Sequence, residues 1–322
     1  MNTPTLEALA EAAGVELPDD LLDAKPLDVP ADKRGWFRFQ RLYDRARRVV
    51  RSEEAMRTIV REAARAEARE GSRRLELQVD PTSYAPYVGG LTEAVEIVLD
   101  EASRAWTTSG VQIGVIVAAS RTRHPLDART LARLAARYAG SGPGEVIGFG
   151  LSNDEWAGDT EDWAGAFRIA RNAGLASLPH GGELRGPKHI RRVVDALEPT
   201  RIGHGVRAAE DPRTLDMLVS RGIAFEVNPS SNVHMGVYAT PDKGPLRTLV
   251  DAGATVALGA DDPLLFLSRL NDQYALARNH LGFTDAELAD LARGSMNASL
   301  AAEADKQRWL AEIDDWLALP DD

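Results

Sequence analysis

Short apolar runs alternate with amphipathic segments along most of the chain, from residue 75 to residue 260. The runs are rich in Val, Ile, Leu and Phe, as in strands that are buried on both faces. We expect seven strands, at residues 75–79, 111–118, 145–151, 175–179, 201–205, 223–228 and 255–260. Between them, apolar residues recur at helical spacing near 91–108, 126–138, 161–173, 187–197, 211–220 and 245–251.

Strands that alternate with helices across short loops are typical of a parallel sheet with right-handed crossovers. Two architectures are consistent with this pattern, an open doubly wound sheet and a closed (β/α)8 barrel of the TIM type. The segment GFGLSN, residues 148–153, has only the first two glycines of a dinucleotide-binding fingerprint, which disfavours the open sheet. A closed barrel needs eight strands, one more than the pattern predicts.

Further helices flank this α/β region. We expect them at 5–13, 37–50 and 53–70, and again in PLLFLSRLNDQYALARNHLG and DKQRWLAEIDDWLALP near the end of the chain. The chain is predicted to be one domain, residues 1–322, since no low-complexity linker divides it. Its parts are a helical lid region at 28–70, the barrel at 71–264 and C-terminal helices at 265–322.

Composition and charge narrow the functional classes. The formal net charge is −11, which disfavours binding to nucleic acid or to acidic membrane surfaces. The basic run RARRVVR at 45–51 is interpreted as the charged outer face of an amphipathic helix. The 322 residues include no cysteine, no apolar run of about 18 residues and no signal-peptide pattern at the start. These features fit a cytoplasmic enzyme and exclude thiolate metal sites.

Polar side chains gather at the carboxyl ends of three predicted strands, where parallel α/β folds carry their active sites. His180 and Glu183 follow the strand at 175–179, His204 lies within RIGHG, and Asp261 and Asp262 follow TVALGA. Each alone has a structural explanation, because Asp-Asp-Pro is a common helix N-cap and NPSSN, residues 228–232, is a common turn. The other four histidines lie elsewhere, so this grouping favours a site.

Imidazole and carboxylate groups are the ligands that zinc takes when no cysteine is present. Zinc lowers the pKa of a bound water to about 7, which makes that water a nucleophile at neutral pH. A glutamate that is not a ligand could then transfer protons, and a second histidine could orient the water. No serine-nucleophile elbow, phosphate-binding P-loop or H-E-x-x-H helix occurs in the sequence.

Four motifs in order resemble the adenosine deaminase family: PHGGE, IGHG, EVNPSSN and GADDP. GWFRFQRLYD, LELQVDPTSY and GFGLSNDE are also similar to it, so the resemblance covers nearly the whole chain. It implies a zinc-dependent (β/α)8 barrel that deaminates adenosine or 2′-deoxyadenosine to inosine or 2′-deoxyinosine and ammonia, in purine salvage. It implies a purine nucleoside as the small-molecule partner and no partner protein.

The resemblance also implies roles for single residues. His180 and Asp261 would be zinc ligands, Glu183 would donate a proton to purine N1, and His204 would position and activate the zinc-bound water. Asp261 would also hydrogen-bond that water.

Other positions would contact the purine. Asp262 would hold purine N7, and Gly181 and Gly182 would leave space for the ring. Asn153 stands where many family members have a glycine whose backbone N–H meets the purine. Trp36 and Phe37, in the lid-like segment 36–50, would line the pocket or pack in the core.

The sequence departs from the family at the front. Family members begin with a strand that carries an H-x-H zinc-ligand pair, and no H-x-H occurs in the 322 residues. We therefore expect the first barrel strand to be missing from a shortened N-terminus, and this chain to bind zinc weakly and deaminate slowly. Two alternatives stay open: a deaminase of adenine or of a modified adenosine, and a metal-free purine-binding protein without catalysis.

Overall fold

The computed structural model describes residues 1–23 and 25–319, and its centre is one parallel sheet. Seven strands follow each other in sequence order across this sheet, and every neighbouring pair is parallel. They are β1 Arg74–Val79, β2 Gln112–Ser120, β3 Val146–Ser152, β4 Ala176–Gly181, β5 Arg201–His204, β6 Ala224–Val227 and β7 Val256–Leu258. Each strand begins and ends within two residues of the bounds predicted for it.

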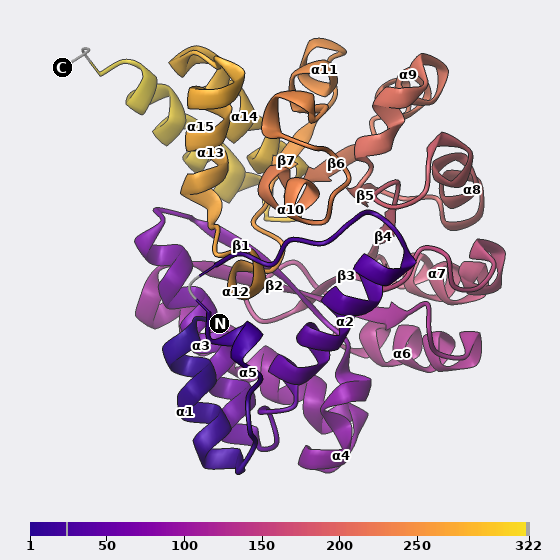
Figure 1. Cartoon of the computed structure of the whole chain (residues 1–322), viewed down its shortest axis with the longest axis vertical. Helices are drawn as coiled ribbons and strands as arrows, with labels where there is room; N and C mark the ends of the chain where they lie inside the picture. Colours follow the sequence, from indigo (N-terminus) through magenta and orange to yellow (C-terminus); the bar gives the residue numbers. More distant parts are fainter. Residues whose placement is uncertain (24, 320–322) are drawn as a thin grey trace.

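Helices surround the curled sheet (Figure 1). Each crossover between neighbouring strands contains a helix: α5 Leu91–Ser109, α6 Pro125–Arg137, α7 Ala164–Asn172, α8 Pro187–Leu197, α9 Pro212–Ser220 and α11 Leu246–Asp251. The chain begins with α1 Thr3–Ala13, α2 Lys33–Arg47 and α3 Glu53–Arg69, and the short α4 Ala85–Val88 precedes α5. It continues after β7 through α12 Pro263–Phe266, α13 Leu270–Leu281, α14 Asp285–Ala298 and α15 Glu303–Leu317.

The strand order identifies the architecture. A doubly wound sheet reverses its strand order at a switch point, whereas this order runs from β1 to β7 without reversal. The fold is therefore that of a (β/α)8 TIM-type barrel with extra helices, as predicted. The described residues supply seven of its strands, and β1 and β7 are the two outer strands of the sheet.

A buried arginine connects strands of the sheet that are far apart in sequence. Arg201 on β5 is 4% exposed, and its Nη1 lies 2.6 Å from Glu76 Oε2 on β1. Its Nε donates to Glu226 Oε1 on β6 at 2.7 Å. A buried guanidinium needs such paired carboxylates to offset the loss of its hydration. This group therefore ties β1 to the far side of the curled sheet.

The helix α2 and the segment before it cover the loops after β6 and β7. Leu27 N donates to Leu265 O at 2.9 Å, and Val29 N donates to His234 O at 2.8 Å. On α2, Phe39 stacks against Phe266 of α12, with ring centroids 5.8 Å apart. This covering segment crosses in front of the strands in Figure 1. The predicted lid region thus packs over the carboxyl ends of the barrel strands.

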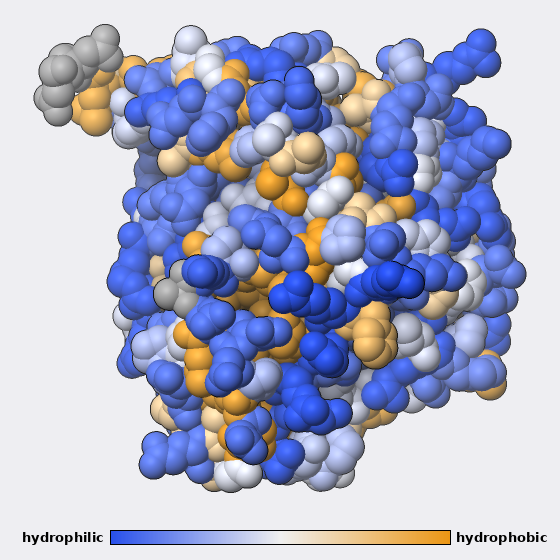
Figure 2. Space-filling view, viewed as in Figure 1, coloured by the Kyte–Doolittle hydropathy of each residue, from blue (hydrophilic) through white to orange (hydrophobic). Residues whose placement is uncertain are grey.

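The amphipathic pattern of this region is confirmed. Phe39, Leu42 and Ala46 of α2 are buried. The opposite face of α2 is exposed and carries a stripe of arginines, Arg34, Arg38, Arg41 and Arg45. Figure 2 shows strongly hydrophilic residues over this part of the surface. Phe37 is 70% exposed, while Trp36 packs on Phe39 with ring centroids 5.3 Å apart.

Two predictions of local structure differ from the observed fold. The helix expected across residues 263–282 is broken, because Leu267 adopts a left-handed conformation with φ of 47° and Ser268 accepts a hydrogen bond from Gln273 Nε2 at 2.7 Å. The NPSSN turn is the start of a helix, α10 Pro229–His234. Residues 320–322 of the predicted C-terminal helical region lie outside the described residues.

Among the described helices, none combines the length and the apolar character that a membrane crossing requires.

Candidate functional site

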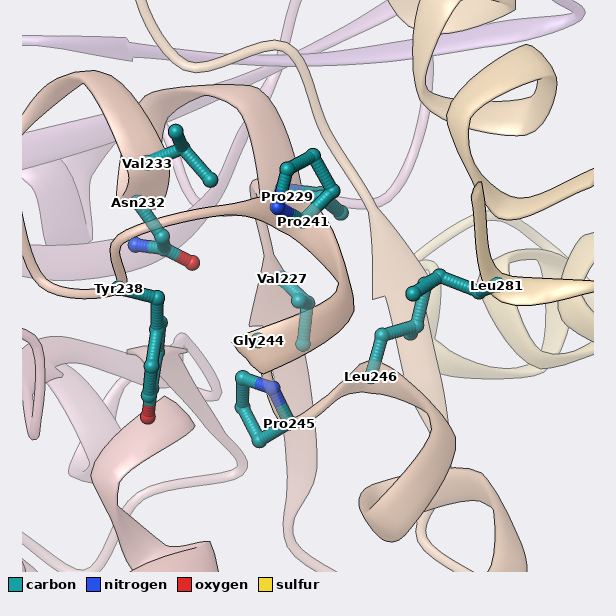
Figure 3. Close-up of a pocket in the computed structure, with 10 residues that line it drawn as sticks. All are labelled: Val227, Pro229, Asn232, Val233, Tyr238, Pro241, Gly244, Pro245, Leu246 and Leu281. Atoms are coloured by element: carbon teal, nitrogen blue, oxygen red, sulfur yellow. The ribbon is translucent and has the colours of Figure 1, made fainter. Parts of the chain in front are cut away.

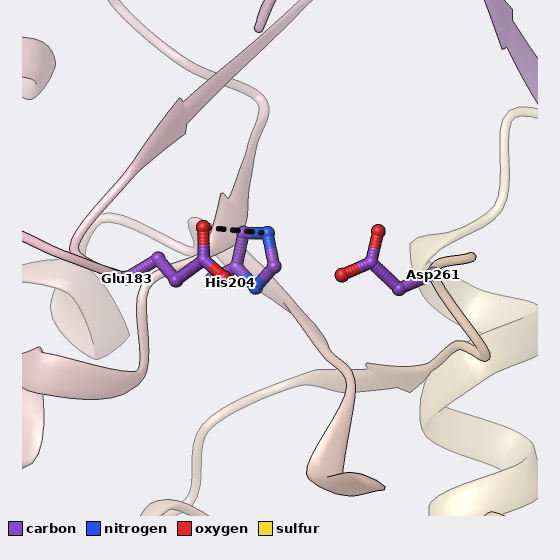
Figure 4. Close-up of side chains that lie close together, drawn as sticks. All are labelled: Glu183, His204 and Asp261. Carbon is purple, nitrogen blue, oxygen red and sulfur yellow. Dashed lines mark ion pairs between the residues drawn. The ribbon is translucent and has the colours of Figure 1, made fainter. Parts of the chain in front are cut away.

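Three of the predicted site residues meet at the carboxyl ends of the strands. Glu183, His204 and Asp261 each offer a ligand atom, and these atoms lie within 4.8 Å of one another. His204 Nε2 is 3.5 Å from Glu183 Oε2, and the Asp261 carboxylate faces the same imidazole from the opposite side (Figure 4). Glu183 and His204 are buried, with 6% and 2% of their surfaces exposed, whereas Asp261 is exposed.

The backbone is constrained at these positions. Asn153, His204 and Asp261 have φ values of 76°, 64° and 56°, in the left-handed region that residues other than glycine rarely adopt. Such conformations cost about 1–3 kcal/mol each and tend to gather at functional sites. Here they occur directly after β3, at the end of β5 and after β7. The turns at these strand ends therefore direct side chains in a way that ordinary loops would not.

Burial changes the protonation of the central pair. Removal from water raises the pKa of Glu183 to about 7, against the opposing charge of His204. Burial alone would lower the pKa of His204, but the carboxylates of Glu183 and Asp261 raise it. A carboxyl group with a pKa near neutrality can give up and take back a proton at working pH. The pair is suited to proton transfer.

The neighbouring residues are shifted in directions that fit binding roles. His180 lies beside His204, with ring centroids 5.2 Å apart, and burial together with that neighbour lowers the pKa of His180. A lowered pKa favours the neutral imidazole, the form that binds a metal. Burial and the charge of Asp261 raise the pKa of Asp262 well above its usual range. Asp262 therefore favours the protonated form, which can donate a hydrogen bond.

The helix α10 supplies a second row of contacts. Ser231 Oγ donates to Asp261 Oδ2 at 2.6 Å, and Asn232 Nδ2 lies 3.4 Å from His204 Nδ1. This contact helps to fix the orientation of the His204 ring, whose Nε2 faces Glu183. Both residues are buried, at 1% and 2% exposed. The sequence had shown NPSSN only as a turn or as part of a family motif.

A small cavity lies behind Asn232, between β6, α10 and the segment 238–246 (Figure 3). The carbonyl oxygen of Asn232 points into it and has no hydrogen-bond partner among the described residues. The cavity is lined by Val227, Tyr238, Leu246 and Leu281, among others. Its volume of about 10 Å³ has room for roughly one water molecule. It is therefore a packing void beside the site and too small for a purine.

The two glycines of PHGGE have a different role from the one expected. A Cβ at Gly182 would lie 2.5 Å from Ile190 Cδ1, and one at Gly181 would lie 3.0 Å from Val193 Cγ2. Both contacts are with α8, so the space that these glycines leave is taken by that helix. Gly182 also has φ of 81°. The glycines thus allow the turn before Glu183 to pack on α8, and a purine contact by the Gly182 backbone stays a prediction.

Two further predictions concern Asn153 and Asp262. Asn153 Oδ1 accepts a hydrogen bond from its neighbour Asp154 N at 2.8 Å, so its side chain is engaged in its own turn. Its φ of 76° is one that a glycine would adopt freely. Asp262 stands at the N-cap of α12, but its side chain makes no capping hydrogen bond. The helix-cap explanation of Asp262 therefore fails.

The residues present fit a metal ion. His180 Nδ1 is buried without a hydrogen-bond partner in the described part of the chain, as a ligand atom would be in the absence of its ion. The ligand atoms that lie within 4.8 Å of one another belong to Glu183, His204 and Asp261, and His180 lies beside this group, with its ring centroid 5.2 Å from that of His204. This donor set suits zinc.

Comparisons with known proteins identify the family of this chain. Residues 1–316 match the family model described as adenosine deaminase. A Streptomyces coelicolor protein with the provisional name adenosine/adenine deaminase is 56% identical over 322 residues, which cover 98% of this chain and 93% of that protein. The chain belongs to the adenosine deaminase family, whose members are hydrolases acting on carbon–nitrogen bonds.

Solved structures show the same fold. The adenine deaminase from Arthrobacter aurescens is 26% identical, with a TM-score of 0.89 that covers 99% of this chain and 95% of that one. An amidohydrolase from Burkholderia ambifaria, solved with bound Zn, is 22% identical, with a TM-score of 0.84 over 99% of this chain and 89% of its own. At that identity the second likeness concerns the fold alone.

Proposed function

We propose that this protein deaminates a 6-aminopurine by hydrolysis, with adenosine and 2′-deoxyadenosine as the first candidate substrates. The observation that carries the proposal is the buried pair of Glu183 and His204, 3.5 Å apart, opposite Asp261. Water adds to the ring carbon that bears the amino group, a ring nitrogen gains a proton, and the carbon–nitrogen bond breaks to release ammonia. Each of these proton movements needs a group that titrates near neutrality.

The residues of the chain take separate parts. Glu183, with its pKa raised to about 7, donates its proton to ring N1 and so makes the adjacent carbon electrophilic. His204, whose imidazole lies between Glu183 and Asp261, orients the attacking water and takes a proton from it. Asp262 in its protonated form donates to N7, a ring atom that can only accept. Together these roles select a purine ring with free N1 and N7.

His180 and Asp261 would hold a zinc ion. When bound there, zinc would make water a stronger nucleophile at neutral pH. Ser231, which donates to Asp261 at 2.6 Å, would fix the orientation of that ligand.

Adenine is the second candidate substrate. The relative from Streptomyces coelicolor has both adenosine and adenine in its name, and the Arthrobacter aurescens structure is of an adenine deaminase. The two substrates differ in the ribose, which a lid over the pocket would contact. The α2 segment, which packs on the loop after β7 through Phe39 and Phe266, is the candidate for that contact.

A substrate panel tests the proposal. The full chain is supplied with zinc and incubated with adenosine, 2′-deoxyadenosine, adenine and a modified adenosine, and the released ammonia is measured. We expect ammonia with at least one of them, and a large fall in the rate of its release in Glu183→Gln. Purine binding that a chelator does not affect, without ammonia release from any member of the panel, would favour the non-catalytic alternative.

A further inference from the structure

The turn that carries Glu183 is held by a buried carboxylate from another loop. Glu155, which follows β3, is 2% exposed. It accepts three backbone hydrogen bonds in succession, from Glu183 N at 3.0 Å, Leu184 N at 3.2 Å and Arg185 N at 2.7 Å. Arg185 Nη1 donates in return to Glu155 O at 3.3 Å. The loops after β3 and β4 are therefore clamped together at the catalytic glutamate.

Two further side chains complete this clamp. His189 of α8 places Nδ1 3.6 Å from Glu155 Oε2, and its Nε2 lies 3.3 Å from Thr160 Oγ1. Arg121, 3% exposed, donates Nη2 to His180 O at 2.9 Å. Both ends of the HGGE turn are thus anchored from outside the turn.

The contacts of the clamp stabilise the ionised form of Glu155. Burial opposes ionisation of Glu155, but His189 and the backbone N–H groups of Glu183 and Arg185 lower its pKa to about 2. The groups around Glu155 therefore keep it ionised at neutral pH. Gly182, the residue before Glu183, has φ of 81°, and glycine backbone is the least restricted of all residues. The glutamate after it needs an external tie to keep one orientation.

We infer that Glu155 is a positioning residue for the reaction, acting through the backbone of Glu183 to aim its carboxyl group at the substrate. His189 supports Glu155 in this role. The inference rests on the proposed function, because it assigns Glu183 a proton transfer. Neither residue touches the reacting atoms.

The first test is a double-mutant cycle in the chain of 322 residues supplied with zinc. Glu155→Gln keeps the shape of the side chain but turns an N–H2 toward backbone N–H donors. With the panel substrate that the wild type deaminates best, we expect kcat to fall roughly 10- to 100-fold, as for small misplacements of catalytic groups. KM should change less than about threefold, because the substrate contacts persist. The matched control is Glu161→Gln, because Glu161 is exposed and pairs with Arg192 away from the site. This variant should leave both kcat and KM unchanged.

The cycle separates positioning from mere support of the fold. In a Glu183→Gln background, measured at high enzyme concentration over hours, adding Glu155→Gln should lower the residual rate less than about threefold, because its target is already gone. Equal effects in both backgrounds would overturn the inference. His189→Gln provides a milder variant should Glu155→Gln fold poorly, with a smaller fall in kcat that also disappears in the Glu183→Gln background.

Hydrogen exchange keeps the test independent of the proposed function. In Glu155→Gln, the amides of residues 183–185 should exchange faster, while a core peptide from β2 exchanges as in the wild type. If no substrate is deaminated but these amides still lose protection, the proposed function fails and the clamp itself stands. Unchanged protection of these amides would refute the clamp whatever the activity.

Discussion

Replacement of Glu183 by glutamine should stabilise the protein near and above neutral pH while greatly slowing its chemistry. Burial raises the pKa of Glu183 from its ordinary value of 4.5 to about 7. The folded state therefore binds this proton more tightly than the unfolded state. A carboxyl group with a raised pKa adds its full stability below about pH 4.5, and that stability is lost as the pH rises through about 7.

The size of this effect follows from the shift. A change in pKa from 4.5 to about 7 corresponds to about 3 kcal/mol of unfolding free energy. Glutamine does not titrate, so the stability of Glu183→Gln relative to the wild type should grow by about 3 kcal/mol between pH 4 and pH 8. His204 lies 3.5 Å away, so the midpoint belongs to the pair.

Urea denaturation of chelator-dialysed protein at several pH values measures this difference directly. Removal of metal keeps the charge of an ion from altering the titration. The exposed Glu161→Gln should give only a small change of opposite sign, because Arg192 lowers the pKa of Glu161 and solvent screens the pair. A difference between Glu183→Gln and the wild type that stays constant from pH 4 to pH 8 would refute the buried, raised-pKa carboxyl.

The same titration predicts the pH dependence of catalysis. Glu183 must carry a proton to donate it, so kcat of the wild type should fall as the pH rises through about 7. Steady-state rates across the pH range, with substrate at saturation, provide the measurement. A rate that continues to rise well above that pH would contradict the role of Glu183 as the proton donor.

Two further substitutions test the surroundings of the site. Gly182→Ala should destabilise the protein by about 2–5 kcal/mol in urea denaturation, because its φ of 81° and its contact with α8 both oppose a side chain. Gly174→Ala, with φ of 83° and open space around it, should cost only about 1–2 kcal/mol, and equal losses would show that α8 is not the obstacle. Ser231→Ala removes the donor to Asp261 and should lower zinc affinity or kcat/KM roughly 10-fold, measured by zinc titration and initial rates. The exposed Ser220→Ala is its control, and a Ser231→Ala protein with unaltered zinc binding and rate would remove that serine from the site.

Hydrophobic patterning predicted the barrel well for a specific reason. Strands of a parallel sheet are covered on both faces, so they appear as continuous apolar runs that are easy to find. β2, from Gln112 to Ser120, is buried along its whole length. The positions of His180, His204 and Asp261 then followed from the rule that sites lie at the carboxyl ends of the strands. The hydrophobic pattern and this one rule were sufficient to predict where these residues lie in the fold.

Contacts between loops could not be predicted in this way. Glu155 and Glu183 are 28 positions apart, and only the fold brings the carboxylate of the first to the backbone of the second. His189 has no signal of its own, since a histidine inside an amphipathic helix is usually a packing residue. Asn232 lies in a stretch with turn composition, whereas the structure places it on α10, where its side chain contacts His204. These contacts depend on the fold and not on the local sequence.

The glycines of PHGGE show the same limit. Their spacing before Glu183 suggested room for a ring, but the structure fills that room with Ile190 and Val193 of α8. A sequence reveals that a side chain is missing, whereas only the fold reveals what occupies its place.

The most direct test of the account is the fate of the water oxygen. Zinc-supplied protein is incubated with adenosine, 2′-deoxyadenosine and adenine in water enriched in oxygen-18, and the purine products are weighed by mass spectrometry. Hydrolytic deamination predicts a 6-oxopurine that carries one heavy oxygen, with one ammonia for each product, and far less of this product from Glu183→Gln in the same time. Recovery of every substrate unchanged, or a product without the label, would contradict hydrolytic deamination at this site.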